Sequence, residues 1–279
     1  MPAPSGFYDD PALYDTLHAP GTAEEVRDLL AAARRHSPHA LRNGAVWLEP
    51  ACGSGRLLAP LARRGFKVVG FDLSQRMVDF AKARLPRGAR IFRADMTDFS
   101  RHVPPASIDF AFNPINTVRH LHSDRAMLAH FRSIARALKP GGAYALGVGL
   151  AAYGLETETE DVWTGRRRGT TVTQVVQYIP ARGGRDRRER VLSHITVSRA
   201  RRSSDFDVAY DLRTYSKDEW FKLLDRSALS IAAVCDERGE ETPAVAPGYF
   251  VFILRRRGDQ AMVVAGGSKG SIRARRKKA

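Results

Sequence analysis

The sequence predicts an α/β fold, a doubly wound and mostly parallel sheet of seven strands with helices on both faces. Short apolar runs alternate with apolar stripes at helical spacing over residues 41–150, and the alternation resumes over 216–258. A glycine-rich turn joins the first apolar run to the first helical stripe, which is typical of ligand-binding α/β sheets. Residues 151–215 lack helical spacing and are rich in threonine and valine, so a small antiparallel β insertion is expected there.

The composition is that of a folded chain with an excess of basic residues. Hydrophobic residues make up 43% of the 279, which suffices for a sizeable core. The 45 basic and 30 acidic residues give a net charge of +15. This charge favours anionic partners, so nucleic acid bound through the basic surface and tail is one expectation, and ordinary solvated arginines are the alternative.

Two features bear on the compartment. No apolar run reaches the roughly 18 residues of a membrane-spanning helix, so no membrane partner is expected. The chain has only two cysteines, Cys52 and Cys235, which we interpret as free thiols in a reducing, cytoplasmic setting. The sequence carries no signal for an oligomeric state.

The N-terminal segment, residues 1–40, is expected to form a helical cap. Its first 21 residues carry four prolines and should be mostly irregular. Thr22-Ala-Glu-Glu25 has the spacing of a capping box, and apolar residues follow at helical spacing. The segment either packs on the core or closes over a bound ligand, with Tyr8 or Tyr14 as the closing side chain.

The glycine-rich turn lies between a buried strand, residues 45–48, and a helix that starts near Leu57. Glycine lets the backbone approach a ligand closely, and the start of a helix offers unpaired N–H groups. The next strand, residues 67–71, ends in Asp72, about 20 residues after the turn. An acid at this distance is placed to bind a ribose hydroxyl pair.

The stretch Glu49-Pro-Ala-Cys-Gly-Ser-Gly55 resembles the first motif of class I S-adenosylmethionine (AdoMet) methyltransferases, roughly acid-x-Gly-x-Gly-x-Gly. Ala51 stands where the family usually has its first glycine. The resemblance covers roughly residues 45–150 and 216–254 and implies a Rossmann-like core, an antiparallel last strand, AdoMet as cofactor and methyl transfer as the activity. It implies cofactor contacts at Glu49, Ala51, Gly53, Ser54, Gly55, Arg56, Asp72, Leu73, Met77, Asp95, Met96 and Asn113.

The resemblance also implies how these contacts divide over the cofactor. Glu49 starts the motif, and residues 53–55 line the methionine part, whose carboxylate Arg56 reaches. Asp72 holds the ribose hydroxyls. Asp95 faces the adenine amino group, and Leu73 and Met96 sandwich the ring. No metal is expected.

Further elements follow in order. Ser74 is a helix N-cap, and that helix should end at Pro86. A strand over residues 89–94 delivers Asp95, and a strand over 107–112 delivers Asn113 to the edge where ligands bind in open α/β sheets. His120, in the loop or short helix beyond, is the candidate proton acceptor. His120 and Asn113 are therefore the candidate catalytic residues.

The second half completes the sheet. Ser123 begins a helix, a strand follows over residues 143–148, and Ser216-Lys-Asp-Glu219 forms another capping box. Strands are expected over 229–235 and 249–254. In the insertion, strands over 170–179, 190–197 and 206–215 would form a lid on the acceptor site. Side chains expected to face the acceptor are Tyr178, His194, Tyr210, Arg213 and Tyr215.

We therefore divide the chain into a cap (1–40), an AdoMet-binding core (41–150 and 216–258), a β insertion (151–215) and a basic, disordered tail (259–279). The favoured function is methylation of a small molecule. One alternative is N-methylation of RNA or DNA. Asn113-Pro-Ile-Asn116 partly resembles the Asn-Pro-Pro-aromatic motif of amino-methyltransferases, but it lacks the aromatic that stacks on a flipped base. A second alternative is a non-catalytic AdoMet-binding protein.

Overall fold

The computed structural model of the protein describes residues 9–200, 202–236 and 238–259. Tyr8 and all of the expected basic tail except Asp259 lie outside these residues. Within the described part, no helix has the length and apolar content needed to cross a bilayer. Both cysteines are free thiols and both are buried, as the sequence predicts.

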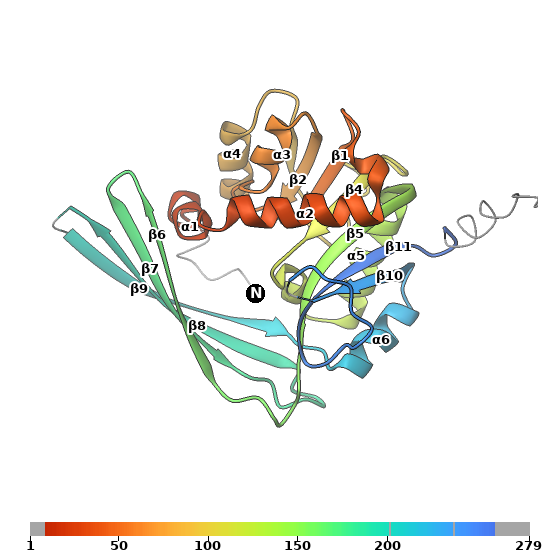
Figure 1. Cartoon of the computed structure of the whole chain (residues 1–279). Helices are drawn as coiled ribbons and strands as arrows, with labels where there is room; N and C mark the ends of the chain where they lie inside the picture. The colour runs from red at the N-terminus through yellow and green to blue at the C-terminus, as the bar shows by residue number, and fades with distance from the viewer. Residues whose placement is uncertain (1–8, 201, 237, 260–279) are drawn as a thin grey trace, which may run out of the picture.

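The core is a seven-stranded sheet with the strand order β10-β11-β5-β4-β1-β2-β3 (Figure 1). Strands β3, β2, β1, β4 and β5 run parallel, and β11 lies antiparallel between β5 and β10. The predicted fold class, including the antiparallel last strand, is therefore confirmed. The strands are β1 (Val46–Pro50), β2 (Lys67–Asp72), β3 (Arg90–Arg93), β4 (Ile108–Asn113), β5 (Leu138–Leu150), β10 (Leu229–Cys235) and β11 (Gly248–Arg256).

Helices cover both faces of this sheet. On one face α2 (Thr22–His36), α3 (Leu58–Arg63) and α4 (Gln75–Arg84) pack around Trp47 and Phe110. On the other face α5 (Asp124–Ala137) and α6 (Lys217–Asp225) pack around Tyr144 and Phe252. Strand β4 is buried along its whole length, as expected for a central parallel strand. The core also has two short 3₁₀ turns. The turn η1 (Pro38–Leu41) lies between α2 and β1, and η2 (Thr117–His120) lies between β4 and α5.

Three of the four predicted helix starts use the expected cap. Ser74 and Ser123 each accept a backbone N–H bond at their helix start, and Ser216 with Glu219 forms a complete capping box. The box predicted at Thr22 is wrong, because Gly21 is the N-cap and no side chain caps this helix. Glu25 instead binds Arg56, which lies beyond the glycine turn.

Within residues 9–21, the part of the expected irregular segment that the structure describes, helix α1 spans Pro11–His18, so the prediction is wrong there. Asp10 caps it by accepting the N–H groups of Ala12 and Leu13, and Pro11 stands at the first helical position. Leu13 and Leu17 bury their side chains against the insertion. The prolines that suggested an irregular segment therefore include one that starts a helix.

The insertion is a four-stranded antiparallel sheet in sequential order, β6-β7-β8-β9. Its strands are β6 (Thr159–Arg167), β7 (Thr170–Ile179), β8 (Arg188–Arg199) and β9 (Arg202–Arg213). The sequence did not predict β6, because most of its side chains are exposed and only Trp163 and Gly165 turn inward. Figure 1 shows the insertion as a long curved ribbon whose far half lies against α1.

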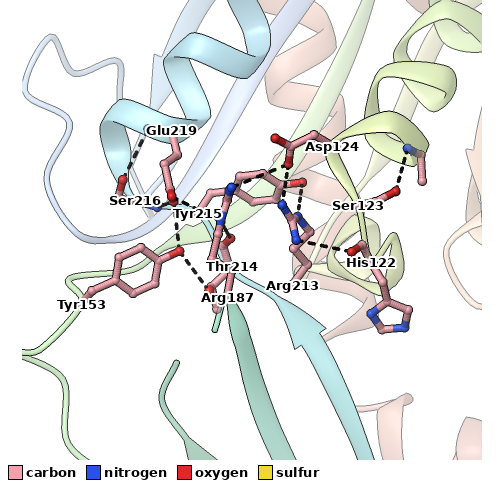
Figure 2. A network of polar contacts seen from close by, with 11 residues as sticks. His122, Ser123, Asp124, Tyr153, Arg187, Arg213, Thr214, Tyr215, Ser216 and Glu219 are labelled. Atoms are coloured by element: carbon pink, nitrogen blue, oxygen red, sulfur yellow. Dashed lines mark hydrogen bonds and ion pairs between the residues drawn. The ribbon is translucent and has the colours of Figure 1, made fainter. Parts of the chain in front are cut away.

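The base of the insertion is fixed to the core by a polar network (Figure 2). The guanidinium groups of Arg187 and Arg213 lie 4.8 and 5.3 Å from the centre of the Tyr215 ring. Arg213 Nη2 donates to Asp124 Oδ1 at 2.7 Å, at the start of α5. Arg187 Nε lies 3.3 Å from Glu219 Oε1, at the start of α6. Two core helices therefore hold the sheet at its root.

Candidate active site

The glycine-rich turn runs from the end of β1 to the start of α3. Ala51, Gly53 and Gly55 all have positive φ, at 49°, 51° and 69°. The turn is held by two backbone bonds, from Cys52 N–H to Phe71 O and from Gly55 N–H to Cys52 O. Alanine in this left-handed region costs about 1–2 kcal/mol, which explains why a glycine is usual at the position of Ala51.

Asp72 lies at the end of β2, directly beside this turn. Its Oδ2 accepts the N–H of Gly53 at 2.9 Å, and its Oδ1 accepts the N–H of Ser74 at 2.9 Å. Burial raises the pKa of this carboxyl, and the hydrogen bonds from Ser74 and Gly53 oppose the rise. The side chain is thus locked in place while each oxygen keeps acceptor capacity for a ligand hydroxyl.

Two polar atoms at neighbouring strand ends are buried and have no hydrogen-bond partner. They are Glu49 Oε2 on β1 and Asn113 Oδ1 on β4. Burial raises the pKa of Glu49 well above its ordinary value, while Arg56 opposes the rise. Asn113 Nδ2 donates to Pro50 O at 2.7 Å, which turns its oxygen the other way. Two unsatisfied acceptors beside a glycine turn fit a ligand that brings N–H or O–H donors, as AdoMet does.

The residues expected around the adenine differ in how far their side chains are exposed. Leu73 is 60% exposed, which leaves its side chain available to a flat ring. Asp95 Oδ1 accepts from the backbone and hydroxyl of Thr97, both at 2.7 Å, and the carboxylate is otherwise exposed. Met96 is partly buried. Met77 is 2% exposed, so its side chain belongs to the packed interior and offers no surface to a ligand.

Arg56 and Ser54 are engaged with other residues of the protein. Both terminal nitrogens of Arg56 donate to the Glu25 carboxylate, at 2.6 and 2.7 Å. The hydroxyl of Ser54 donates to Asp15 at 2.7 Å, and both residues are buried. In this arrangement the guanidinium that was expected to reach the cofactor carboxylate is neutralised by Glu25.

Helix α1 brings Tyr14 over the turn. A Cβ added to Gly53 would lie 3.3 Å from Tyr14 Cε1, so the ring packs closely over this glycine. The Tyr14 ring also lies 4.4 Å from that of His18. Of the two tyrosines expected to close over the ligand, Tyr14 therefore lies at the turn, and Tyr8 is outside the described residues.

One face of the insertion, which we call the inner face, carries an apolar cluster. It consists of Val176, Val191 and Leu212, all buried, with Tyr178 and Tyr210 packed against them. The rings of His120 and Tyr210 lie 5.4 Å apart, so the inner face reaches the turn that follows Asn113. Surrounding protein atoms, His122 and Arg119 lower the pKa of His120, which keeps it neutral near pH 7.

Three residues predicted to face the acceptor lie elsewhere. Tyr215 is fully buried at the root of the insertion, and Arg213 is bound to Asp124 there. His194 is half exposed on the opposite face, with its Nδ1 2.8 Å from Asp207. A strand alternates its side chains between two faces, so a prediction without the register could not separate His194 from Tyr210.

Sequence reasoning missed two residues that the structure places at this site. Arg119 is 6% exposed and its Nη2 lies 3.1 Å from Glu189 Oε1, on β8. Asp15 is fully buried and also binds Arg84 and Arg167. Asp15 has a local signal, a carboxylate within an apolar helical stripe, whereas the Arg119–Glu189 pair joins residues 70 positions apart and has none.

Comparison with known proteins agrees with this geometry. The profile of a methyltransferase domain family matches residues 48–142. A dTDP-3-amino-3,6-dideoxy-α-D-glucopyranose N,N-dimethyltransferase of Streptomyces fradiae is 34% identical over 133 residues, which is 47% of this chain and 49% of that protein. A crystal structure of DesVI from Streptomyces venezuelae superposes with a TM-score of 0.67, at 23% identity over 86% of this chain and 95% of that one, and so shares the fold.

The chain spans about a third to a half of the length of the first curated relatives it matches, between 37% and 49%. A cypemycin N-terminal methyltransferase of a Streptomyces species is matched more fully. It is 30% identical over 178 residues, which cover 59% of this chain and 69% of that protein. By this relationship, and by the glycine turn with its two acids at successive strand ends, the chain belongs to the family of class I S-adenosylmethionine-dependent methyltransferases.

Proposed function

We propose that the protein transfers the methyl group of AdoMet to an amino nitrogen of a small-molecule acceptor. The observation that carries the proposal is the pair of buried, unpartnered oxygens of Glu49 and Asn113 beside the glycine turn. The inner face reaches the turn after Asn113 through the contact of Tyr210 with His120. The names of two relatives, an N,N-dimethyltransferase and an N-terminal methyltransferase, support nitrogen as the acceptor atom.

On the cofactor side, Glu49 is positioned to bind an ammonium group and Asp72 a pair of ribose hydroxyls. Leu73 offers an apolar surface for the adenine. AdoMet, when bound, supplies a methyl group made reactive by its sulfonium. The main task of the protein is then to hold the acceptor nitrogen in line, and orientation alone can supply up to about 7–11 kcal/mol.

On the acceptor side, Asn113 and His120 are the proposed working residues. Asn113 Oδ1 can accept a hydrogen bond from the acceptor amine, which turns the nitrogen lone pair toward the methyl group. The neutral imidazole of His120 can take up the proton that the amine must lose. The cap segment and the insertion would enclose these groups, with Tyr14 and Tyr210 as their inward side chains.

Nucleic-acid bases are not included in this proposal. Asn116 occupies the position of the aromatic in the amino-methyltransferase motif. It adopts a left-handed conformation with φ 60°, and its Oδ1 accepts the N–H of Gly149 at 2.5 Å. This side chain stabilises the β4–η2 connection and provides no stacking surface for a flipped base.

Titration calorimetry with AdoMet and with S-adenosylhomocysteine tests the cofactor half of the proposal, and micromolar binding of both is expected. Formation of S-adenosylhomocysteine in the presence of a panel of primary and secondary amines tests the other half. Turnover only with alcohols or thiols would move the acceptor atom away from nitrogen. Tight cofactor binding with no turnover on any acceptor class would favour a non-catalytic AdoMet-binding protein.

A further inference from the structure

The chemistry of the inner face indicates which kind of amine it accepts. We propose, on the basis of the function proposed above, that the acceptor is an amine on an apolar or aromatic body that carries no phosphate or carboxylate. The proposal follows from three properties of the acceptor side: tyrosine rings beside a buried apolar cluster, arginines that already bind carboxylates, and a further carboxylate at Asp161.

The floor is apolar. Val176, Val191 and Leu212 are at most 7% exposed and form a continuous cluster. Tyr178 and Tyr210 border it with their rings, which combine an apolar body with one hydroxyl at the tip. The three aliphatic side chains are already covered, so the partly exposed tyrosine rings are what can offer apolar area to an apolar or aromatic ligand.

The arginines around this region are already paired. Arg119 lies against Glu189 and donates its Nε–H to Arg213 O at 2.9 Å. At the turn, Arg56 is bound by Glu25 through two bonds. The others with a contact in this region also bind carboxylates: Arg167 binds Asp15, Arg213 binds Asp124, and Arg187 lies beside Asp124 and Glu219.

A phosphate group would therefore have to displace a carboxylate from its arginine. The displaced carboxylate would then be left without its partner in a largely buried position, which opposes the exchange. The pair of Arg119 and Glu189 is the relevant one, because the arginine is 6% exposed and the glutamate 19%. The net positive charge of the chain therefore does not provide an arginine for an anionic acceptor at this position.

The remaining charges favour a cation. Asp161 lies opposite Val176 on the neighbouring strand, and Glu189 continues the inner face toward the root of the insertion. Burial raises the pKa of Tyr178 to about 12, and Tyr210, Asp161 and Glu189 each add to the rise while Arg119 opposes it. With Glu189 paired to Arg119, Asp161 remains as a carboxylate on this side of the sheet that can attract a protonated amine.

The acceptor proposed here differs from those of two relatives, whose names describe N,N-dimethyltransferases of dTDP-linked amino sugars. A nucleoside diphosphate brings two phosphates, and its usual partners in proteins are free arginines, lysines or helix N-termini. The shared fold therefore carries two acceptor chemistries, and the inner face decides between them.

Inorganic pyrophosphate is the probe for the test, titrated by calorimetry into protein saturated with S-adenosylhomocysteine. Wild type and Arg119→Gln should bind it equally, through surface arginines alone, because Arg119 is already neutralised. Glu189→Gln leaves the Arg119 guanidinium without its carboxylate partner. This variant should bind at least one pyrophosphate about tenfold more tightly than wild type does. The proposal would be overturned if wild type binds pyrophosphate and Arg119→Gln abolishes that binding. It would also be overturned if Glu189→Gln binds pyrophosphate with wild-type affinity while melting at the wild-type temperature.

A matched pair of amines keeps the test decisive if a variant does not fold. Tyramine and its phosphate ester, tyramine O-phosphate, are titrated into the same wild-type complex. Tyramine should bind at least tenfold more tightly, and tighter binding of the ester would refute the proposal. Failure of S-adenosylhomocysteine to bind at all would instead refute the proposed function, so the two failures are distinguishable.

Discussion

The hydroxyl of Ser54, in the glycine turn, donates a 2.7 Å hydrogen bond to the fully buried carboxylate of Asp15, on helix α1. The same carboxylate binds Arg84 at the end of α4 and Arg167 at the end of β6. The Asp15 side chain therefore connects the cap, the glycine turn, the core and the insertion. Because Tyr14 precedes it and lies over Gly53, the position of α1 is tied to the cofactor side.

Asp15→Asn should weaken this junction, because an amide cannot balance two guanidinium groups. We expect a loss of about 1–3 kcal/mol in the free energy of unfolding, since hydrogen bonds to charged groups contribute about 1.5–3 kcal/mol each and the two arginines can be rehydrated. The Kd for AdoMet should rise several-fold. Urea unfolding and calorimetry measure the two effects. Asp205→Asn, at an exposed position of β9, is the control and should change neither.

Asp72→Asn should weaken cofactor binding. The substitution keeps the shape of the side chain but removes the charge and one acceptor oxygen beside Gly53. A charge-assisted contact of about 1.5–3 kcal/mol corresponds to a roughly 10- to 100-fold rise in the Kd for AdoMet. Asp79→Asn on the surface of α4, where Asp79 only accepts from Gln75, is the matched control. An unchanged affinity would remove Asp72 from the binding site.

His120→Gln should lower kcat while leaving the Kd for AdoMet unchanged. Loss of a general base typically costs about 10²-fold or more. Because the pKa of His120 is lowered, the imidazole stays neutral below its ordinary value of 6.5, so the acidic limb of kcat against pH should lie below that value. His194→Gln, half exposed on the opposite face of the insertion, is the control. Equal activity of the two variants would show that His120 moves no proton.

His130 should make stability depend on pH. It is fully buried between Met96 O and the Tyr144 hydroxyl, and burial lowers its pKa from 6.5 to about 4, although Asp95 opposes the change. The unfolded chain then binds a proton between these values that the folded chain does not. The contribution is present above pH 6.5 and is lost as the pH falls toward 4, by about 3 kcal/mol in total.

Chemical denaturation at several pH values tests this linkage. The stability advantage of wild type over His130→Gln should shrink steadily from pH 7 to pH 5. His18 adds a parallel wild-type loss, because burial also lowers its pKa to about 4, so the comparison with the variant is what isolates His130. An advantage that stays constant over this range would contradict a buried neutral imidazole.

Local features of the chain were predictable from the sequence. Ser74, Ser123 and Ser216 cap helices because each hydroxyl accepts the backbone N–H of the residue three positions later. The glycine turn and Asp72 are predictable for a similar reason, since strand, turn and helix are adjacent in the chain. The central strands of the core sheet, such as β4, were found because burial on both faces produces apolar runs.

Features that depend on distant partners were not predictable. Glu25 has the spacing of a capping box, yet an ion pair with Arg56 competes for its carboxylate and prevails. Strand β6 exposes most of its side chains, so its strand character comes from pairing with β7 rather than from its own pattern. Glu189 becomes the ion-pair partner of Arg119 only when folding brings the two residues together.

The two ends of the insertion meet where the chain leaves and re-enters the core. Ala151 donates its N–H to Tyr215 O at 2.8 Å, and Ala151 pairs with Ser216 as an isolated bridge. Segments whose ends are adjacent can be exchanged by recombination without forcing the host domain to rearrange. A lineage could therefore inherit its methyl-donor machinery unchanged while grafting on a new recognition module, so substrate range within such families can diverge much faster than their shared chemistry.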